Sequence, residues 1–176
     1  LTAGAVTLTH PAREPLTVDP DDPDDAARLI AWVTRLADPG RPAPAFVARA
    51  SVGMTDTDFP SIALLGRSSL AALSERVGKP LAMERFRGNI WLEGLAPFAE
   101  FDLVGETLRI GDATLRVREV ITRCKATTVD PETGVADADT LGALRDGWGH
   151  QDFGVYAEVI AGGRVAYQWQ SLLWLW

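Results

Sequence analysis

Hydrophobic and polar residues alternate along several short segments of the chain, which is the period of a half-buried β-strand. This alternation predicts strands at 46–52 and 153–160, and the apolar run 61–65 predicts a short buried strand. Two further apolar runs between Ala5 and Val18 flank the turn sequence His-Pro-Ala-Arg, so we expect a loose hairpin there.

Glycine-containing turns connect the other expected strands. Gly111-Asp112 predicts a tight hairpin between 107–110 and 113–120, with Leu115, Val117 and Ile121 on one face of the second strand. We also expect a strand at 89–92, and a turn at Gly162-Gly163 that leads into a strand at 164–169.

Three segments have the spacing of helices. An acidic run at 19–25 precedes apolar residues at helical spacing up to Leu36, and carboxylates are favourable at a helix start. Ser68 or Ser69 is expected to cap a second helix that ends at Gly78, and 141–144 belongs to a third. Seven or more strands, mostly antiparallel, and two or three helices indicate a mainly β fold with peripheral helices, which we expect to be an antiparallel β-barrel.

Length and composition narrow the classes of protein. With 176 residues and 47% hydrophobic content, the chain can bury one domain core with room for a small appendage. A net charge of −7 without a basic run argues against nucleic-acid binding. The apolar end at 171–176 is far shorter than the roughly 20 residues of a membrane span. We see no signal or transit sequence and expect a cytoplasmic protein.

Cys124 is the single cysteine, which excludes an internal disulfide, a Cys-rich zinc site and an iron–sulfur cluster. His10 and His150 have no zinc-ligand spacing either. Arg123 and Lys125 flank the cysteine and would favour its thiolate, the form that binds metals. The alternative is a buried structural cysteine.

Other polar residues have both a functional and a structural interpretation. Arg85 and Arg87 precede Asn89 at a strand start, which suits a phosphate and a polar heterocycle, although two surface arginines in weak ion pairs fit equally well. Ser68 at a helix N-terminus is placed either to bind an anion or only to cap. Asp58 is either a site residue or an ordinary turn residue.

Four stretches of the chain together resemble the MOSC domain, a family that includes the C-terminal domain of molybdenum cofactor sulfurases and the mitochondrial amidoxime-reducing component. The most specific is Arg-Cys followed by Thr-Thr-Val-Asp-Pro and a glycine turn. The stretches are 59–65 with 68–73, 85–90, 122–134 and 153–159. The resemblance covers roughly Leu1 to Tyr167.

The resemblance implies a molybdenum-pterin cofactor whose metal is bound by Cys124. It implies that the cofactor's pterin and phosphate are held by Arg87, Asn89 and Ser68, with Thr122 and Arg123 beside the cysteine as further contacts. It also suggests that Asp58 is an acidic residue facing the metal. A soft thiolate suits a metal bound by sulfur, and an anionic cofactor needs cationic partners.

By this resemblance we expect an oxidoreductase that reduces N-hydroxylated or other N-oxygenated small molecules with electrons from a separate protein. The alternative is a sulfurtransferase in which Cys124 carries a persulfide supplied by a pyridoxal phosphate-dependent desulfurase. A third interpretation is a non-catalytic cofactor-binding module.

The chain departs from the family pattern in three places. Gly88 stands where relatives usually have Pro, and the usual Gly-Asp turn and final strand are missing near the C-terminus. We expect 1–60 to be the N-terminal part of the family's β-rich region, without some Lys and Arg that grip the phosphate, and 61–176 to be the MOSC core with an apolar tail. We expect this tail to pack on its own barrel or across a homodimer interface.

Overall fold

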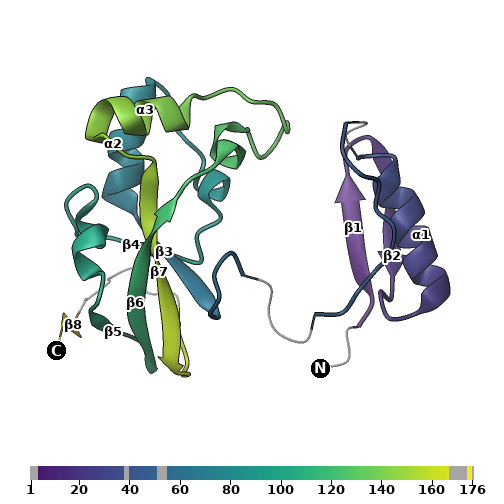
Figure 1. Cartoon of the computed structure of the whole chain (residues 1–176), viewed down its shortest axis with the longest axis horizontal. Helices are drawn as coiled ribbons and strands as arrows, with labels where there is room; N and C mark the ends of the chain where they lie inside the picture. The colour runs from purple at the N-terminus through teal and green to yellow at the C-terminus, as the bar shows by residue number, and fades with distance from the viewer. Residues whose placement is uncertain (1–3, 38–39, 51–54, 167–173, 176) are drawn as a thin grey trace. The chain divides into compact units, whose positions relative to one another are not determined.

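The computed structural model describes residues 4–37, 40–50, 55–166 and 174–175. The chain divides into two compact units, Leu1–Met54 and Thr55–Trp176 (Figure 1).

The first unit is a hairpin with one helix. Strands β1 (Val6–His10) and β2 (Arg13–Val18) are antiparallel, which confirms the predicted hairpin. Helix α1 (Pro23–Thr34) begins at Asp22, whose carboxylate accepts hydrogen bonds from the backbone of Asp24 and Asp25. The acidic run is therefore a helix start, as predicted.

The prediction of a strand at 46–52 is wrong for residues 46–50. Residues 46–50 form no strand, and 51–52 lie outside the described residues. A strand needs a partner for its backbone groups, and the two strands of this hairpin pair with each other rather than with 46–50. Alternation alone does not supply that partner.

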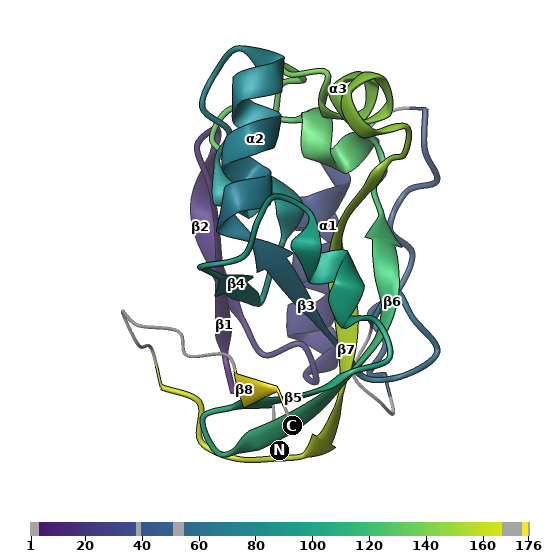
Figure 2. The same cartoon turned by 90° about the vertical axis from the view of Figure 1, so that its left-hand side faces the viewer.

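The described residues of the second unit form a six-stranded sheet with the order β4-β3-β7-β6-β5-β8, and of the strand pairs among them only β3–β4 is parallel. The sheet is curved, and β4 and β8 are its two edges (Figure 2). The fold is mainly β with peripheral helices, and the sheet forms a half-barrel. The strands are β3 (Ser61–Gly66), β4 (Ile90–Leu92), β5 (Thr107–Ile110), β6 (Ala113–Thr122), β7 (Asp152–Ala161) and β8 (Trp174–Leu175).

The segment after β7 differs from the predicted hairpin. Residues 164–166 form no strand, and 167–169 lie outside the described residues. The carbonyl of Arg164 instead accepts a hydrogen bond from the Asp112 backbone at 3.0 Å, so the chain crosses the β5–β6 turn. It then pairs as β8 with β5, where Leu175 lies opposite Leu108. Part of the apolar tail therefore joins the sheet.

Helices α2 (Arg67–Val77) and α3 (Thr140–Trp148) lie beside each other at the end of the sheet where β6 ends and β7 begins (Figure 1). The described part of the unit also has three short 3-10 helices: η1 (Met83–Phe86), η2 (Ala99–Leu103) and η3 (Lys125–Thr128). Among the described residues, no helix has both the length and the apolar content required to cross a membrane.

The core of the second unit has two apolar clusters. One lies under α2, α3 and η1 and includes Leu73, Leu144 and Phe153, and the other includes Leu108 and Leu115. The prediction that Leu115, Val117 and Ile121 share one face is wrong, because Ile121 belongs to the first cluster and the other two to the second. Register shifts in β6 after Val117 change the face of the sheet on which the following side chains lie.

Candidate functional site

Cys124 lies just beyond β6, at the start of η3, with its side chain exposed. Its carbonyl oxygen accepts hydrogen bonds from the Thr127 backbone at 3.2 Å and the Thr127 hydroxyl at 3.1 Å. The Thr127 hydroxyl also meets that of Thr140, 2.7 Å away in the core. The backbone is thus held from beneath while the thiol faces outward, and the alternative of a buried structural cysteine is wrong.

Arg123 joins three segments around this cysteine. Its Nε and Nη2 donate to the carbonyl of Phe153 at 2.8 and 2.6 Å, and its Nη1 donates to the carbonyl of Phe86 at 3.0 Å. Burial lowers the pKa of Arg123 to about 10, so the guanidinium is still charged at neutral pH. The side chain that we expected to contact a cofactor is therefore used to hold the end of β6 against β7 and η1.

The local backbone of β7 makes this arrangement possible. Gly154 has φ +81°, and a Cβ there would lie 2.8 Å from the Leu64 carbonyl oxygen and 3.4 Å from Arg123 Nη2. Only glycine allows both the left-handed backbone and the close approach of β3 and the guanidinium. The Phe-Gly pair of the predicted strand is thus part of the support for the site.

Tyr156 and Asp56 form a pair that the sequence pattern did not predict. The Tyr156 hydroxyl donates to Asp56 Oδ2 at 3.3 Å, and burial together with the nearby Asp56 charge raises the pKa of Tyr156. Both interact electrostatically with Arg123, as does Cys124. We call these four residues the Arg123 cluster. It offers a thiol, a protonated phenol and a carboxylate near one partly buried cation.

Asp58 lies in the same loop as Asp56 and is exposed. A hydrogen bond from the Thr57 hydroxyl to the Phe59 carbonyl, at 2.6 Å, holds this loop, and the Arg118 guanidinium lies over the Phe59 ring, 5.0 Å from its centroid. Asp56, rather than Asp58, is the acid that the structure connects to Arg123.

Arg87 and Asn89 follow η1 directly. Arg87 is exposed, and within the described part of the chain its guanidinium forms no ion pair. The Asn89 Oδ1 accepts the Ala63 backbone N–H at 2.8 Å, and the Asn89 backbone donates to the Ala63 carbonyl at 3.0 Å. Asn89 therefore fixes the segment to β3, while the side chain of Arg87 is exposed to solvent. Gly88 packs closely between them, since a Cβ there would lie 2.8 Å from Leu65 Cδ1.

The N-terminus of α2 differs from the expectation. The N-cap is Gly66 and neither serine caps the helix, so that prediction is wrong. Ser69 is buried and donates to Glu100 Oε2 at 2.8 Å, while the Gly66 backbone donates to Glu100 Oε1 at 3.3 Å. The fully buried Glu100 carboxylate thus caps the helix from a distant segment. Ser68 is half-buried beside it.

Thr122 is placed at the edge of the site, where its hydroxyl donates to Asp152 Oδ1 at 2.6 Å between β6 and β7.

Among the described residues there is no group of three or more His, Cys, Asp or Glu that could hold a metal ion. An exposed thiol near an exposed cationic segment still fits a sulfur-bound metal on an anionic cofactor, which needs one protein thiolate and guanidinium partners.

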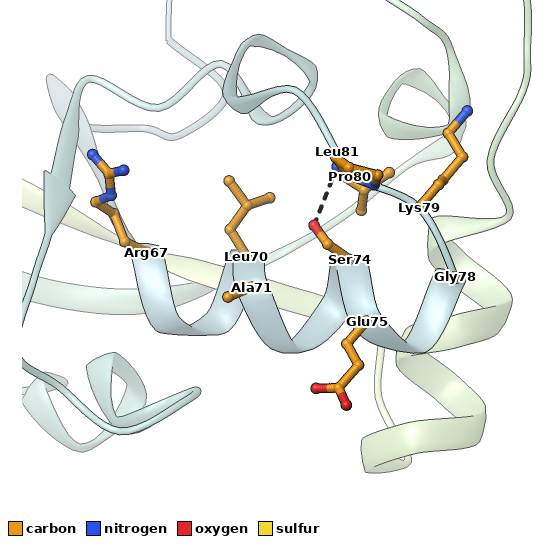
Figure 3. Close-up of a pocket in the computed structure, with 9 residues that line it drawn as sticks. All are labelled: Arg67, Leu70, Ala71, Ser74, Glu75, Gly78, Lys79, Pro80 and Leu81. Atoms are coloured by element: carbon orange, nitrogen blue, oxygen red, sulfur yellow. Dashed lines mark hydrogen bonds between the residues drawn. The ribbon is translucent and has the colours of Figure 1, made fainter.

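A shallow pocket lies elsewhere, along α2 and the turn that follows it (Figure 3). Its cavity volume is about 670 Å³, and the Leu81 backbone donates to the Ser74 hydroxyl at 3.2 Å across it. None of the predicted site residues lines this pocket. The lining residues are Arg67, Leu70, Ala71, Ser74, Glu75, Gly78, Lys79, Pro80 and Leu81.

The fold and the site define a β-rich domain that presents one thiol beside cationic side chains. Residues 56–168 match the MOSC domain, a match that lies within the second unit and covers more than half of the chain. The chain therefore belongs to the MOSC domain family.

Curated relatives match parts of the chain. Mitochondrial amidoxime reducing component 2 of Rattus norvegicus is 41% identical over 80 residues, which cover 46% of this chain and 23% of that protein. Mitochondrial amidoxime-reducing component 1 of Homo sapiens is 38% identical over 79 residues, which cover 45% of this chain and 23% of that protein. Molybdenum cofactor sulfurase of Caenorhabditis elegans is 36% identical over 97 residues, which cover 53% of this chain and 13% of that protein. The matches thus span less than a quarter of each relative.

Proposed function

We propose that the second unit binds a molybdenum-pterin cofactor through Cys124 and reduces N-hydroxylated or other N-oxygenated small molecules. The observation that carries this proposal is the exposed thiol of Cys124 on a backbone fixed by Thr127. The amidoxime-reducing relatives support the substrate class. The family match supports a molybdenum-cofactor-related role, and the proposed reaction is one specific form of that role.

Six of the predicted site residues have a part in this proposal. The Cys124 thiolate binds molybdenum, and Arg87 holds the cofactor's phosphate through charge-assisted hydrogen bonds. Ser68 and the Asn89 amide contact the pterin and phosphate, while Arg123 and Thr122 hold the end of β6 in place. Bound molybdenum would supply two-electron oxygen-atom transfer.

The Tyr156–Asp56 pair is suited to handling protons. Reduction of an N-hydroxyl group to an amine and water consumes two electrons and two protons. Burial and the nearby Asp56 charge raise the pKa of Tyr156, so its phenol is protonated at neutral pH. Its single O–H proton is donated to Asp56 Oδ2, and a substrate oxygen would receive this hydrogen bond in place of the carboxylate. Electrons come from a separate protein, and we expect the acidic chain to work in the cytoplasm.

A direct test uses the cofactor-loaded protein and an aryl amidoxime, with reduced methyl viologen as an artificial electron donor. We expect viologen oxidation coupled to formation of the aryl amidine in the wild type, and none in Cys124→Ser. A wild-type protein that contains stoichiometric molybdenum but does not reduce amidoximes or N-hydroxylated amines would contradict the proposed reaction.

The second candidate is a sulfur carrier. An exposed single cysteine between Arg123 and Lys125 can hold a persulfide, and the sulfurase relative from Caenorhabditis elegans favours this interpretation. Its partner would be a pyridoxal phosphate-dependent desulfurase. Incubation with such an enzyme and cysteine should then add one sulfur atom to Cys124 and transfer it to an acceptor, and an unmodified Cys124 would contradict this candidate.

A further inference from the structure

Arg85 is a buried cation whose role the proposed function leaves open. Its side chain is 2% exposed, and its Nη2 lies 2.7 Å from Asp137 Oδ1 and 3.6 Å from Asp130 Oδ2. Asp137 also pairs with Lys79. We call these four residues the Arg85 network. Its two cations and two carboxylates balance in formal charge.

The network holds the far end of the loop that carries Cys124. The Asp137 backbone donates to the carbonyl of Thr128, the last residue of η3, at 3.0 Å. Asp130 closes the adjoining turn, because its carbonyl accepts the Gly134 backbone N–H at 2.8 Å. Thr127 holds the near end through the Cys124 carbonyl. The loop from 124 to 137 is therefore fixed at both ends.

The short helix η1 also contacts Arg123, the residue that precedes Cys124. The residue after Arg85, Phe86, accepts a hydrogen bond from Arg123 Nη1 at 3.0 Å through its carbonyl. Arg87 and Asn89 follow immediately. One helical turn thus contacts the chain before and after Cys124 and leads into the segment proposed to hold the cofactor's phosphate.

The hydrogen bonding of Arg85 is incomplete, which is energetically unfavourable for a residue with a purely structural role. Its Nε and Nη1 are buried and have no hydrogen-bond partner among the described residues. Burying a charge with unsatisfied donors is unfavourable, and well-packed apolar side chains often replace buried ion pairs without loss of stability. Stability alone therefore does not account for an arginine at this place.

We propose that Arg85 is a positioning residue that fixes the Cys124 loop relative to the Arg87–Asn89 segment, so that the thiol and the guanidinium of Arg87 reach one cofactor. The planar guanidinium can face two carboxylates at once, which a lysine ammonium does less well. The part that concerns the cofactor rests on the proposed function, whereas the part that concerns the loop does not.

The test compares Arg85→Met with Leu108→Ala in the full chain. Leu108 is fully buried in the other apolar cluster, so its truncation lowers the melting temperature without touching the network. Two quantities are measured at an equal interval below each melting temperature: hydrogen–deuterium exchange at 125–129 and molybdenum content per chain.

For Arg85→Met we expect exchange at 125–129 to rise about tenfold or more and molybdenum content to fall well below that of Leu108→Ala. Arg85→Lys should lie between Arg85→Met and the wild type. Unchanged exchange at 125–129, or equal molybdenum content in Arg85→Met and Leu108→Ala, would overturn the inference. If Arg85→Met does not fold, Asp137→Asn is measured in the same two ways with the same criteria.

The outcomes also separate this inference from the proposed function. If the wild type holds no molybdenum, the proposed function fails, and the exchange measurement alone decides whether Arg85 fixes the loop. If the wild type holds molybdenum and Arg85→Met exchanges and binds as Leu108→Ala does, only the role of Arg85 is wrong.

Discussion

The Cys124 loop and the N-terminus of α2 were both expected to hold parts of one cofactor, yet their polar groups are used differently. At Cys124 the backbone is hydrogen-bonded to Thr127 while the thiol is exposed. At α2 the Glu100 carboxylate already accepts from the Gly66 backbone and the Ser69 hydroxyl. A ligand therefore has an open group at the first place and an internal competitor at the second.

This difference shows that an anion-ready helix end is not in itself a ligand site. The positive end of a helix dipole is satisfied by any carboxylate, including one from the same chain. A Cβ at position 66 would lie 2.7 Å from Glu100 Oε2, so the glycine and the carboxylate fit together closely. We therefore expect Arg87 to contribute more to phosphate binding than Ser68.

The largest effect is expected for Cys124→Ser. Because Cys124 is exposed, the substitution opens no cavity, and the fold should keep its melting temperature within about 2 °C. Loss of the soft ligand should abolish molybdenum-dependent turnover. Turnover at the wild-type level, measured with the amidoxime assay, would show that the thiol is not the metal ligand.

Arg87→Ala should weaken cofactor binding without weakening the apo protein. A charge-assisted hydrogen bond contributes about 1.5–3 kcal/mol, which is roughly a 10- to 150-fold change in affinity. Because the side chain is exposed, the melting temperature of the apo form should hardly change. A matched control is Ser68→Ala, for which we expect the smaller loss of cofactor. If Ser68→Ala loses more cofactor than Arg87→Ala does, our expectation that Arg87 contributes more to phosphate binding is wrong.

Glu100→Gln should act on stability instead. The amide keeps the shape of the side chain but removes the negative charge at the helix N-terminus, at an expected cost of about 1–3 kcal/mol in the free energy of unfolding. Urea denaturation of the apo form measures this. An unchanged midpoint would mean that the carboxylate does not stabilise α2. Increased cofactor affinity in the folded variant would further support competition at this end.

The smallest effect is a pH dependence at Asp137. Its hydrogen bond with Lys79, followed by that with Arg85, lowers the pKa of Asp137 below its ordinary value of 3.8. A lowered folded-state pKa gives stability that is present above the unfolded pKa and lost as the pH falls through the folded one. The melting-temperature difference between wild type and Asp137→Asn should therefore stay constant above about pH 5 and shrink as the pH falls below about 4. A constant difference would contradict this.

Much of the sheet could be predicted because its signals are local. The alternation at 153–160 and the Gly111-Asp112 turn correctly gave β7 and the β5–β6 hairpin, which also placed Cys124 just beyond β6. The strand expected at 46–52 had the same alternation, but 46–50 pair with no strand. Local pattern predicts the tendency to form a strand, whereas pairing depends on the whole fold.

The environment of the site was harder to predict because it depends on long-range contacts. Tyr156 meets Asp56 across 100 positions of sequence, and Glu100 reaches Ser69 across 31. Arg123 could be named from its motif, yet its attachment to the carbonyls of Phe86 and Phe153 could not. One available signal was the isolated tyrosine in a strand that otherwise alternates apolar residues with small or acidic ones.

The central claim is that Cys124 binds the molybdenum of a pterin cofactor, and metal and mass analysis of the purified wild-type chain tests it most directly. The account predicts about one molybdenum and one pterin per chain, lost together in Cys124→Ser, with an otherwise unmodified cysteine. A wild-type chain that holds neither, and whose Cys124 instead carries one additional sulfur atom, would contradict the account and favour the sulfur carrier.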